Sequence, residues 1–304
     1  MTLNIQTQNQ VDFQQFHPSS LRLRSGQAFI LHSSFVHIPA GPFIYGPEVT
    51  YERLEQAPPP RPRQVMELDE FWIARYPVTF AEWKKFLDAT GFRWLGNWYT
   101  IRQGWRGWLR RFAIVPAYPA EMARYPIVDV SQADALAYCA WLSEELGMNC
   151  TLPSEFQWEK AARGTEGRTY PWGEALPRPE LAHLRATHTL GWDYYLHNLW
   201  VQPKQELARS GWYWRIGAPL PVGAISQNMS PYGCYDMSGN IWEWTTSLYN
   251  ENLPGFHVVK GGSWGYSPQH TAANCRSACS VTTPSVDYRA QGTGFRVIIV
   301  NYGN

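Results

Sequence analysis

The chain has 304 residues, of which 44% are hydrophobic and 15% aromatic, so it can bury a sizeable core in one large domain or two small ones. Its formal net charge of +1 argues against broad electrostatic binding to nucleic acid, and no apolar run is long enough to predict a membrane span. The N-terminus lacks the basic start and apolar stretch of a secretory signal, and the five cysteines are scattered. We therefore expect a cytoplasmic protein whose thiols are reduced.

The chain is expected to begin with an extension and to continue as one domain. Residues 1–34 are rich in Gln and lack hydrophobic periodicity, so we interpret them as an N-terminal extension ahead of a domain over residues 35–304. Apolar residues alternate from Phe35 to Gly46 and break at Gly and Pro, which predicts a β-hairpin. Residues 65–77 predict one further strand.

Three helix starts carry capping signals. Thr79 is followed three residues later by Glu82, and Ser154 by Gln157, which are both capping boxes, while Ser131 is the N-cap expected for the helix between them. The first helix has a periodic apolar face that we expect to be buried, made of Phe80, Trp83, Phe86 and Leu87.

Two segments have the composition of insertions. Residues 92–112 interleave Trp with Arg, a pattern that can stack on nucleotide bases, although packing of Arg on Trp is the commoner arrangement. Residues 178–216 contain His183, His188 and His197, whose spacing matches no metal motif. We therefore expect both insertions to be structural.

Six short motifs occur in order between residues 35 and 299. They are Ile38-Pro-Ala-Gly-Pro-Phe43, the run from Leu152 to Gly164, Tyr170-Pro-Trp-Gly173, Gly239-Asn-Ile-Trp-Glu-Trp244, Gly261-Gly-Ser-Trp264 and Gly294-Phe-Arg-Val297. Together they resemble the formylglycine-generating enzyme (sulfatase-modifying factor) family. The resemblance implies an α+β fold, the large and irregular variant of the C-type lectin fold, with low regular secondary structure, a small twisted antiparallel sheet and a few helices.

The resemblance does not decide the function, because members of the family act differently. Some oxidise a substrate cysteine to formylglycine with copper. Others are sulfoxide synthases with a three-histidine iron site in an extra N-terminal domain, and residues 1–34 offer only His17 and His32 for such a site. A third group comprises the ligand-binding variable proteins of diversity-generating retroelements, in which mutagenesis targets a C-terminal segment ending near Gly-Phe-Arg.

The copper ligands of the family are replaced in this sequence. In the formylglycine oxidases, two cysteines hold copper at positions that correspond here to Thr271 and Arg276. Cys275 and Cys279 lie close by and would be the catalytic pair in an alternative hypothesis, a copper-dependent oxidase with atypical cysteines. Because the departure falls on the ligands themselves, we do not expect copper and assign no catalytic residue.

The segment between Trp264 and Gly294 is instead the expected ligand surface. It is longer than an ordinary connection, and Tyr, Ser and Thr dominate it, which is typical of adaptable contact surfaces. The leading hypothesis is a non-catalytic variable protein whose segment 264–296 binds an unknown protein or small molecule. We expect Trp264, Arg276, Phe295 and Arg296 to be scaffold. The predicted ligand-binding residues are Tyr266, His270, Thr271, Cys279, Thr282, Asp287 and Tyr288.

The resemblance also implies a calcium site. Asp236 and Glu243 would supply carboxylates, and Gly239 and Ile241 would supply backbone oxygens, a ligand set that suits a hard cation. The alternative is that Glu243 satisfies hydrogen-bond donors within a turn.

Overall fold

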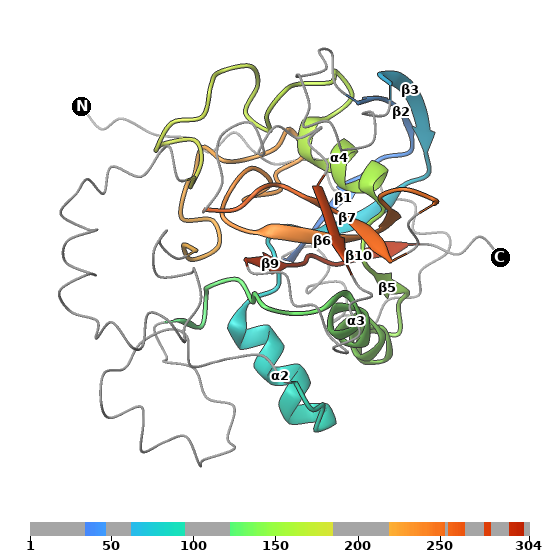
Figure 1. The fold of residues 1–304 in the computed structure, drawn as a ribbon, viewed down its shortest axis with the longest axis vertical. Coiled ribbons are helices and arrows are strands. Elements are labelled where there is room, and N and C mark those ends of the chain that lie inside the picture. The colour runs from blue at the N-terminus through green and yellow to red at the C-terminus, as the bar shows by residue number, and fades with distance from the viewer. Residues whose placement is uncertain are drawn as a thin grey trace, which may run out of the picture.

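The computed structural model describes residues 34–46, 62–94, 122–184, 219–252, 255–264, 277–280 and 292–300, with only the backbone described over 277–280. Helices and strands together form a mixed α+β fold with few helices and small sheets (Figure 1). Among the described residues, the helices are α2 (Phe80–Thr90), α3 (Gln132–Leu146) and α4 (Glu155–Arg163). The strands are β1 (Phe35–Ile38), β2 (Gly41–Tyr45), β3 (Gln64–Leu68), β4 (Phe71–Ala74), β5 (Cys150–Thr151), β6 (Trp242–Leu248), β7 (Phe256–Lys260), β8 (Ser277–Ser280), β9 (Thr293–Gly294) and β10 (Ile298–Val300).

One four-stranded sheet joins the two ends of the described chain. Its order is β1-β4-β10-β5, and all three pairings are antiparallel. Ile73 of β4 lies opposite both Val36 of β1 and Ile298 of β10. These three residues are buried in one cluster with Trp158 of α4. Burial of this face therefore ties the strands near residues 35 and 300 to the middle of the chain.

A second four-stranded sheet has the order β8-β7-β6-β9. The β6–β9 pairing is parallel and sets Trp242 opposite Thr293 and Glu243 opposite Gly294. Strand β7 pairs antiparallel with β6 on one side and with β8 on the other. This sheet carries three of the family motifs, because β6, β7 and β9 contain or adjoin them.

The predicted hairpin between Phe35 and Gly46 is wrong. Strand β1 pairs with β4, whereas β2 forms a separate two-stranded sheet with β3. Gly41 has a φ of 123°, and Lys160 Nζ donates to the carbonyl oxygens of Pro39 and Gly41 at 2.7 and 2.8 Å. This bend sends β2 away from β1. The single strand predicted over residues 65–77 is likewise two strands, β3 and β4, which belong to different sheets.

The predicted helix starts are confirmed. The Thr79 hydroxyl oxygen accepts a hydrogen bond from the Glu82 amide, and the Glu82 carboxylate accepts one from the Thr79 amide. Ser154 and Gln157 repeat this arrangement at the start of α4. Ser131 is the N-cap of α3, where Asp134 completes a third capping box. Such caps satisfy amide groups that a helix start leaves free, each contributing about 1 kcal/mol.

Aromatic rings connect α2 and α3 to the second sheet. The Trp83 ring of α2 stacks on Tyr138 of α3 with centroids 5.8 Å apart, and Phe295 meets both rings edge-on at 6.0 and 5.4 Å. Phe86 and Trp141 extend this group. We call these five rings the aromatic layer. It positions the Phe295 side of the second sheet by apolar contact.

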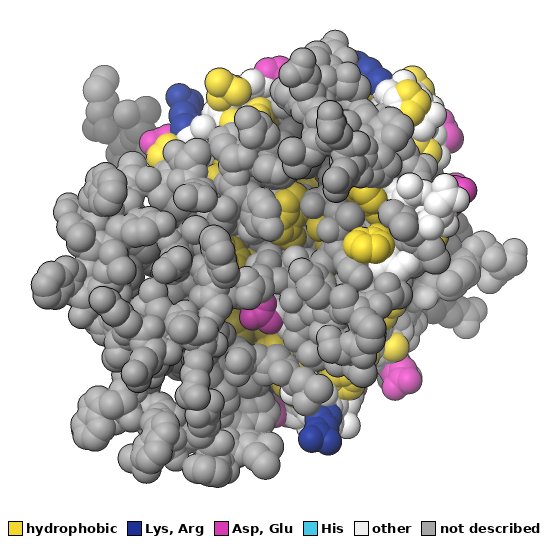
Figure 2. Space-filling view, in the orientation of Figure 1, with side chains coloured by type: hydrophobic (Ala, Val, Ile, Leu, Met, Phe, Trp, Pro, Cys, Tyr) yellow, Lys and Arg dark blue, Asp and Glu magenta, His cyan; other side chains and the backbone are white. Residues whose placement is uncertain are grey.

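Charged side chains of the described residues are scattered singly over the face shown in Figure 2, in keeping with the balanced composition. Within the described parts of the chain, none of the helices has both the length and the apolarity that crossing a membrane requires.

Candidate functional site

The two ends of segment 265–291 touch each other. Trp264 is buried, with 2% of its surface exposed. A Cβ atom added to Gly292 would lie 3.1 Å from Trp264 Cη2 and 3.2 Å from Cζ3, and Gly292 has a φ of 74°. A side chain at position 292 would therefore be both crowded and strained. The structure confirms that Trp264 is scaffold and brings the start and end of the segment together.

Backbone hydrogen bonds hold both ends on the same stretch of chain. The Trp264 amide donates to the Asn240 carbonyl at 3.1 Å, and the Trp242 amide donates to the Gly292 carbonyl at 2.9 Å. The Asn240 side chain in turn accepts a bond from the Leu220 amide and donates to the Leu220 carbonyl, at 2.8 and 3.2 Å. We call residues 240–244, 261–264 and 292–296 the frame.

Two glycines of the family motifs, Gly294 in the frame and Gly239 beside it, are packed too closely to carry a side chain. A Cβ atom on Gly294 would lie 2.1 Å from the Ile127 carbonyl oxygen, and one on Gly239 would lie 2.8 Å from the His183 carbonyl oxygen. Real Cβ atoms do not approach backbone oxygens so closely, so the backbone would have to move. The glycines of these motifs are required by close approach.

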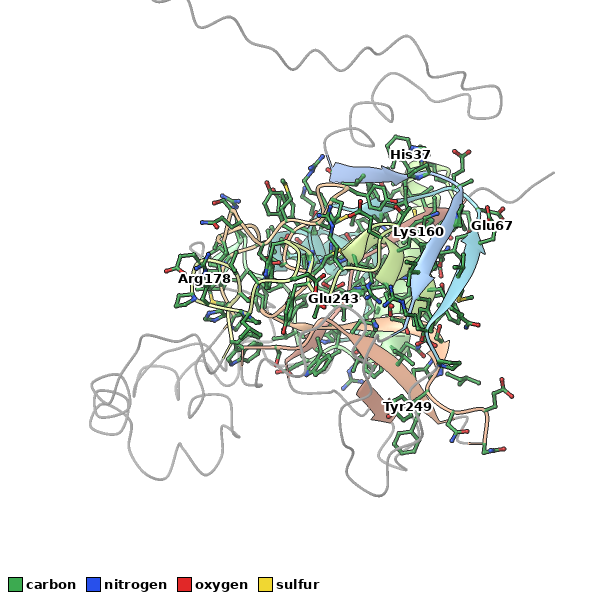
Figure 3. All side chains as sticks on the ribbon, turned by 90° about the horizontal axis from the view of Figure 1, so that it is seen from above. His37, Glu67, Lys160, Arg178, Glu243 and Tyr249 are labelled. Atoms are coloured by element: carbon green, nitrogen blue, oxygen red, sulfur yellow. The ribbon has the colours of Figure 1, made fainter. Side chains whose placement is uncertain are left out.

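A buried ion pair crosses the frame. Arg296 Nε donates to Glu243 Oε2 at 2.6 Å, Arg296 Nη2 donates to Glu243 Oε1 at 2.7 Å, and both residues are fully buried. Trp158 Nε1 donates to Glu243 Oε2 at 2.7 Å. Burial opposes the charged guanidinium, but Glu243 outweighs this effect and raises the pKa of Arg296. Figure 3 places Glu243 among the inner side chains, far from the outlying Arg178 and Tyr249.

The same guanidinium reaches two other segments. Arg296 Nη1 donates to the Ala74 carbonyl at 3.1 Å, and Nη2 donates to the Tyr235 carbonyl at 2.9 Å. Arg296 therefore joins the end of β4, the turn before β6 and the start of β10 through one planar group. The prediction that Phe295 and Arg296 are scaffold is confirmed, because both are fully buried.

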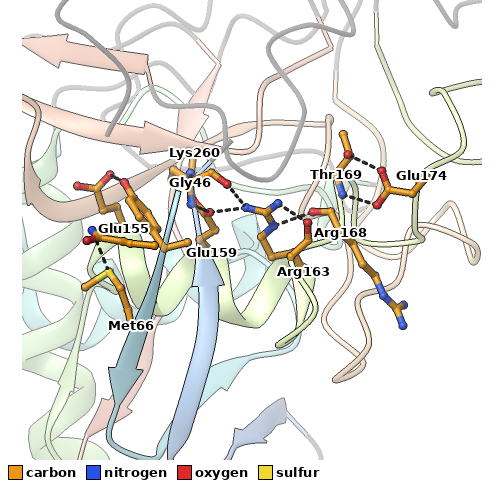
Figure 4. Close-up of polar contacts among 12 residues, drawn as sticks. Gly46, Met66, Glu155, Glu159, Arg163, Arg168, Thr169, Glu174 and Lys260 are labelled. Atoms are coloured by element: carbon orange, nitrogen blue, oxygen red, sulfur yellow. Dashed lines mark hydrogen bonds and ion pairs between the residues drawn. The ribbon is translucent and has the colours of Figure 1, made fainter. Parts of the chain in front are cut away.

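A second buried charge cluster is centred on Glu159, the residue after Trp158 in α4. Glu159 of α4 accepts hydrogen bonds from Arg163 Nη1 at 2.7 Å, from Lys260 Nζ at 3.0 Å and from the Gly46 amide at 2.8 Å (Figure 4). Lys260 Nζ also lies 5.5 Å from the centre of the Trp158 ring. Trp158 thus connects this cluster to the Glu243–Arg296 pair.

The predicted calcium ligands do not form the expected shell. Both oxygens of Glu243 already accept bonds from Arg296 and Trp158, and a guanidinium repels a second cation. The Asp236 carboxylate is buried, which raises its pKa to about 6, and accepts a bond from the Gly223 amide.

Within the residues that the structure describes, no group of three or more His, Cys, Asp or Glu could hold a metal ion. The residues therefore do not fit calcium at Glu243, although the Asn228 Oδ1 acceptor nearby in sequence has no partner among the described residues. Calcium binding by Asp236 with the backbone oxygens of Gly239 and Ile241, and without Glu243, stays a prediction that thermal melts with EDTA can test.

The structure describes the side chains of three cysteines, and all three are buried free thiols. Burial raises the pKa of Cys139 well above its usual range, and raises those of Cys150 and Cys234 to about 11. A thiol that stays protonated is a poor nucleophile and metal ligand. Cys279 lies in β8 opposite His257, and only its backbone is described.

The remaining predicted residues lie outside the described parts of the chain. These are Cys275 of the oxidase hypothesis, the scaffold residue Arg276, and the ligand-binding residues Tyr266, His270, Thr271, Thr282, Asp287 and Tyr288. Sequence reasoning missed Asn240 and Gly292, which hold the two ends of segment 265–291, and it missed Lys260 of the buried charge cluster around Glu159. Only Asn240 had a signal, since it lies within the Gly-Asn-Ile-Trp-Glu-Trp motif.

Comparison with known proteins agrees with this fold. The sulfatase-modifying factor enzyme 1-like domain matches residues 25–300. Hercynine oxygenase of Mycolicibacterium smegmatis is 30% identical over 272 residues, which cover 77% of this chain and 54% of the oxygenase, so this chain spans about half of that relative. The inactive C-alpha-formylglycine-generating enzyme 2 of Mus musculus is 29% identical over 303 residues, 90% of this chain and 88% of that protein.

Two solved structures are similar over nearly the whole domain. PvdO from Pseudomonas aeruginosa has a TM-score of 0.59 at 25% identity, covering 87% of this chain and 93% of PvdO. Variable protein 1 of Treponema denticola has a TM-score of 0.57 at 16% identity, covering 87% and 94%, which shows a shared fold alone. With the family model covering most of its length, the chain belongs to the sulfatase-modifying factor, or formylglycine-generating enzyme, family.

Proposed function

We propose that this chain is a non-catalytic ligand-binding protein that displays segment 265–291 from a rigid frame. The observation that carries the proposal is the contact between Trp264 and Gly292, which closes the base of the segment. Backbone hydrogen bonds with residues 240 and 242 hold both ends, and we expect the frame to be stable without the segment's own side chains. A segment anchored in this way is free to vary its exposed residues and its ligand.

The chemistry of the cysteines supports a role without catalysis. Thr271 and Arg276 stand where the formylglycine oxidases hold copper, and the described thiols Cys139, Cys150 and Cys234 are buried and protonated. One relative of similar length bears the name of an inactive formylglycine-generating enzyme, so loss of the activity has a parallel within the family.

More finely, we propose a variable protein of a diversity-generating retroelement. The residue types between Trp264 and Gly294 include Tyr, His, Thr, Ser, Cys, Val and Asp, which arise when adenines in an Asn codon are changed. The fold shared with the Treponema variable protein supports this choice of scaffold, and the ligand would be a protein or small molecule.

Sequencing of the gene's surroundings tests the finer proposal. We expect a near-copy of the region coding for residues 264–296 beside a reverse transcriptase gene, and differences between isolates confined to adenine positions of that copy. A locus without either element, and isolates that vary evenly along the gene, would contradict it.

An activity assay tests the absence of catalysis. Incubation with Cu(I), oxygen and a Cys-x-Pro-x-Arg peptide should leave the peptide unchanged by mass spectrometry. An aldehyde product that is lost in Cys275→Ser, and kept in the matched buried-thiol variant Cys139→Ser, would instead support the oxidase hypothesis.

A further inference from the structure

Tyr76 and Tyr235 form a stacked pair outside segment 265–291. The rings of Tyr76 and Tyr235 have centroids 5.3 Å apart and planes inclined by 27°, and both side chains are half-buried. The Tyr235 amide donates to the Arg75 carbonyl at 2.9 Å, which fixes one residue of the pair beside the other. A Cβ atom on Gly223 would lie 2.8 Å from Tyr76 Cε1, so the loop at residue 223 presses directly against the Tyr76 ring.

Two arginines flank this pair, and each is anchored by one backbone carbonyl. Arg75 Nη1 donates to the Gly233 carbonyl at 3.0 Å, and Arg124 Nη2 donates to the Val222 carbonyl at 3.4 Å. A guanidinium has five N–H donors, so most donors of both groups are unused by the described residues. Neither arginine forms an ion pair with a carboxylate of the described residues.

The two guanidiniums act on the same phenol. Burial of the ring raises the pKa of Tyr76, and the positive charges of Arg75 and Arg124 both oppose this rise. Their charges therefore lie within electrostatic reach of the Tyr76 hydroxyl. Asp236, the carboxylate that acts on this phenol, is buried and bound to the Gly223 amide, so it does not neutralise either arginine by direct contact.

We propose that Arg75, Arg124 and the Tyr76–Tyr235 pair form a binding site for an aromatic ligand that carries a phosphate or carboxylate group. Guanidinium groups bind such oxyanions with charge-assisted hydrogen bonds, and the half-exposed rings offer a surface on which a planar group stacks. The site uses no residue of segment 265–291, so it stands or falls independently of the proposed function.

Isothermal titration calorimetry with phenyl phosphate tests the site, with inorganic phosphate and phenol at the same ionic strength as comparisons. Phenyl phosphate should bind more tightly than either part alone. Arg124→Gln keeps an N–H donor for the Val222 carbonyl and removes the charge, so it should weaken phenyl phosphate binding about tenfold, as expected for one lost charge-assisted bond.

The matched control is Arg178→Gln, which removes an exposed arginine that lies 3.9 Å from Glu180. This variant should bind phenyl phosphate as the unchanged protein does, and thermal melts should show that both variants are folded. The proposal is overturned if phenyl phosphate does not bind at millimolar concentration, if it binds no better than inorganic phosphate, or if the two glutamine variants weaken binding equally.

Discussion

Phe295 belongs to both the frame and the aromatic layer, but different interactions stabilise these two regions. The aromatic layer is a set of rings on α2, α3 and the frame, and its members contact one another through apolar surface. In the frame, the same short stretch of chain depends on a buried ion pair, on glycines that allow close approach and on backbone bonds between distant segments. From this comparison we expect the aromatic layer to tolerate volume-conserving apolar changes, whereas the frame depends on specific partners.

The largest expected effect is the loss of one partner from the buried ion pair. Arg296→Met leaves the Glu243 carboxylate buried without its cation and should lower the free energy of unfolding by about 3–5 kcal/mol. Lys84→Met is the matched control, because Lys84 pairs with Asp88 on the exposed face of α2. That variant should lose less than about 1 kcal/mol in urea unfolding. Equal losses in the two variants would mean that Arg296 contributes no more than a surface charge.

A volume-conserving change in the apolar region should cost less. Leu87 of α2 is buried in the cluster that contains the aromatic layer, and methionine fills a similar volume with more flexibility. We expect Leu87→Met to lower the free energy of unfolding by less than about 1.5 kcal/mol. A loss as large as that of Arg296→Met, measured in the same urea series, would remove the contrast between the two regions.

The smallest effect concerns pH. His257 on β7 is half-buried, and this burial lowers the pKa of its ring below the usual 6.5, because the charged form is disfavoured. The unfolded chain then binds more protons near its own pKa, so stability from this group is complete above about pH 6.5 and falls as the pH drops through that value.

His257→Gln should therefore flatten the fall in melting temperature between about pH 7.5 and 5.5 relative to the unchanged protein. His37→Gln is the matched control, since His37 bonds to the exposed Glu70. A pH profile that is flattened by the control and not by His257→Gln would contradict the assignment.

The sequence was sufficient for features that local pattern decides. Thr79 and Glu82 predicted the start of α2. The spacing of Phe80, Trp83, Phe86 and Leu87 predicted its buried face. The hairpin over residues 35–46 failed because Lys160, far along the chain, fixes the bend that separates β1 from β2. A contact between residues so far apart in the chain leaves no pattern in the sequence around the bend.

In the candidate site, too, the sequence predicted features that depend on local motifs and missed those that depend on distant partners. Trp264, Phe295 and Arg296 were predicted as scaffold from their motifs and are buried. Glu243 was assigned to calcium because the resemblance to the family implied such a site. No feature of the sequence near Glu243 indicated that Arg296, 53 residues later, is its partner. The ligand surface was predicted from the residue types between Trp264 and Gly294, and it stays a prediction because the side chains of the predicted ligand-binding residues lie outside the described parts of the chain.

The central claim is that segment 265–291 is displayed by the frame and does not build it. Urea unfolding of Tyr266→Ala and Tyr288→Ala beside Trp264→Ala tests this claim most directly. We expect the two tyrosine variants to change the free energy of unfolding by no more than about 0.5 kcal/mol each, and Trp264→Ala to lower it by about 3–5 kcal/mol. If the tyrosine variants unfold as readily as Trp264→Ala, the segment is part of the core and the proposed ligand surface is contradicted.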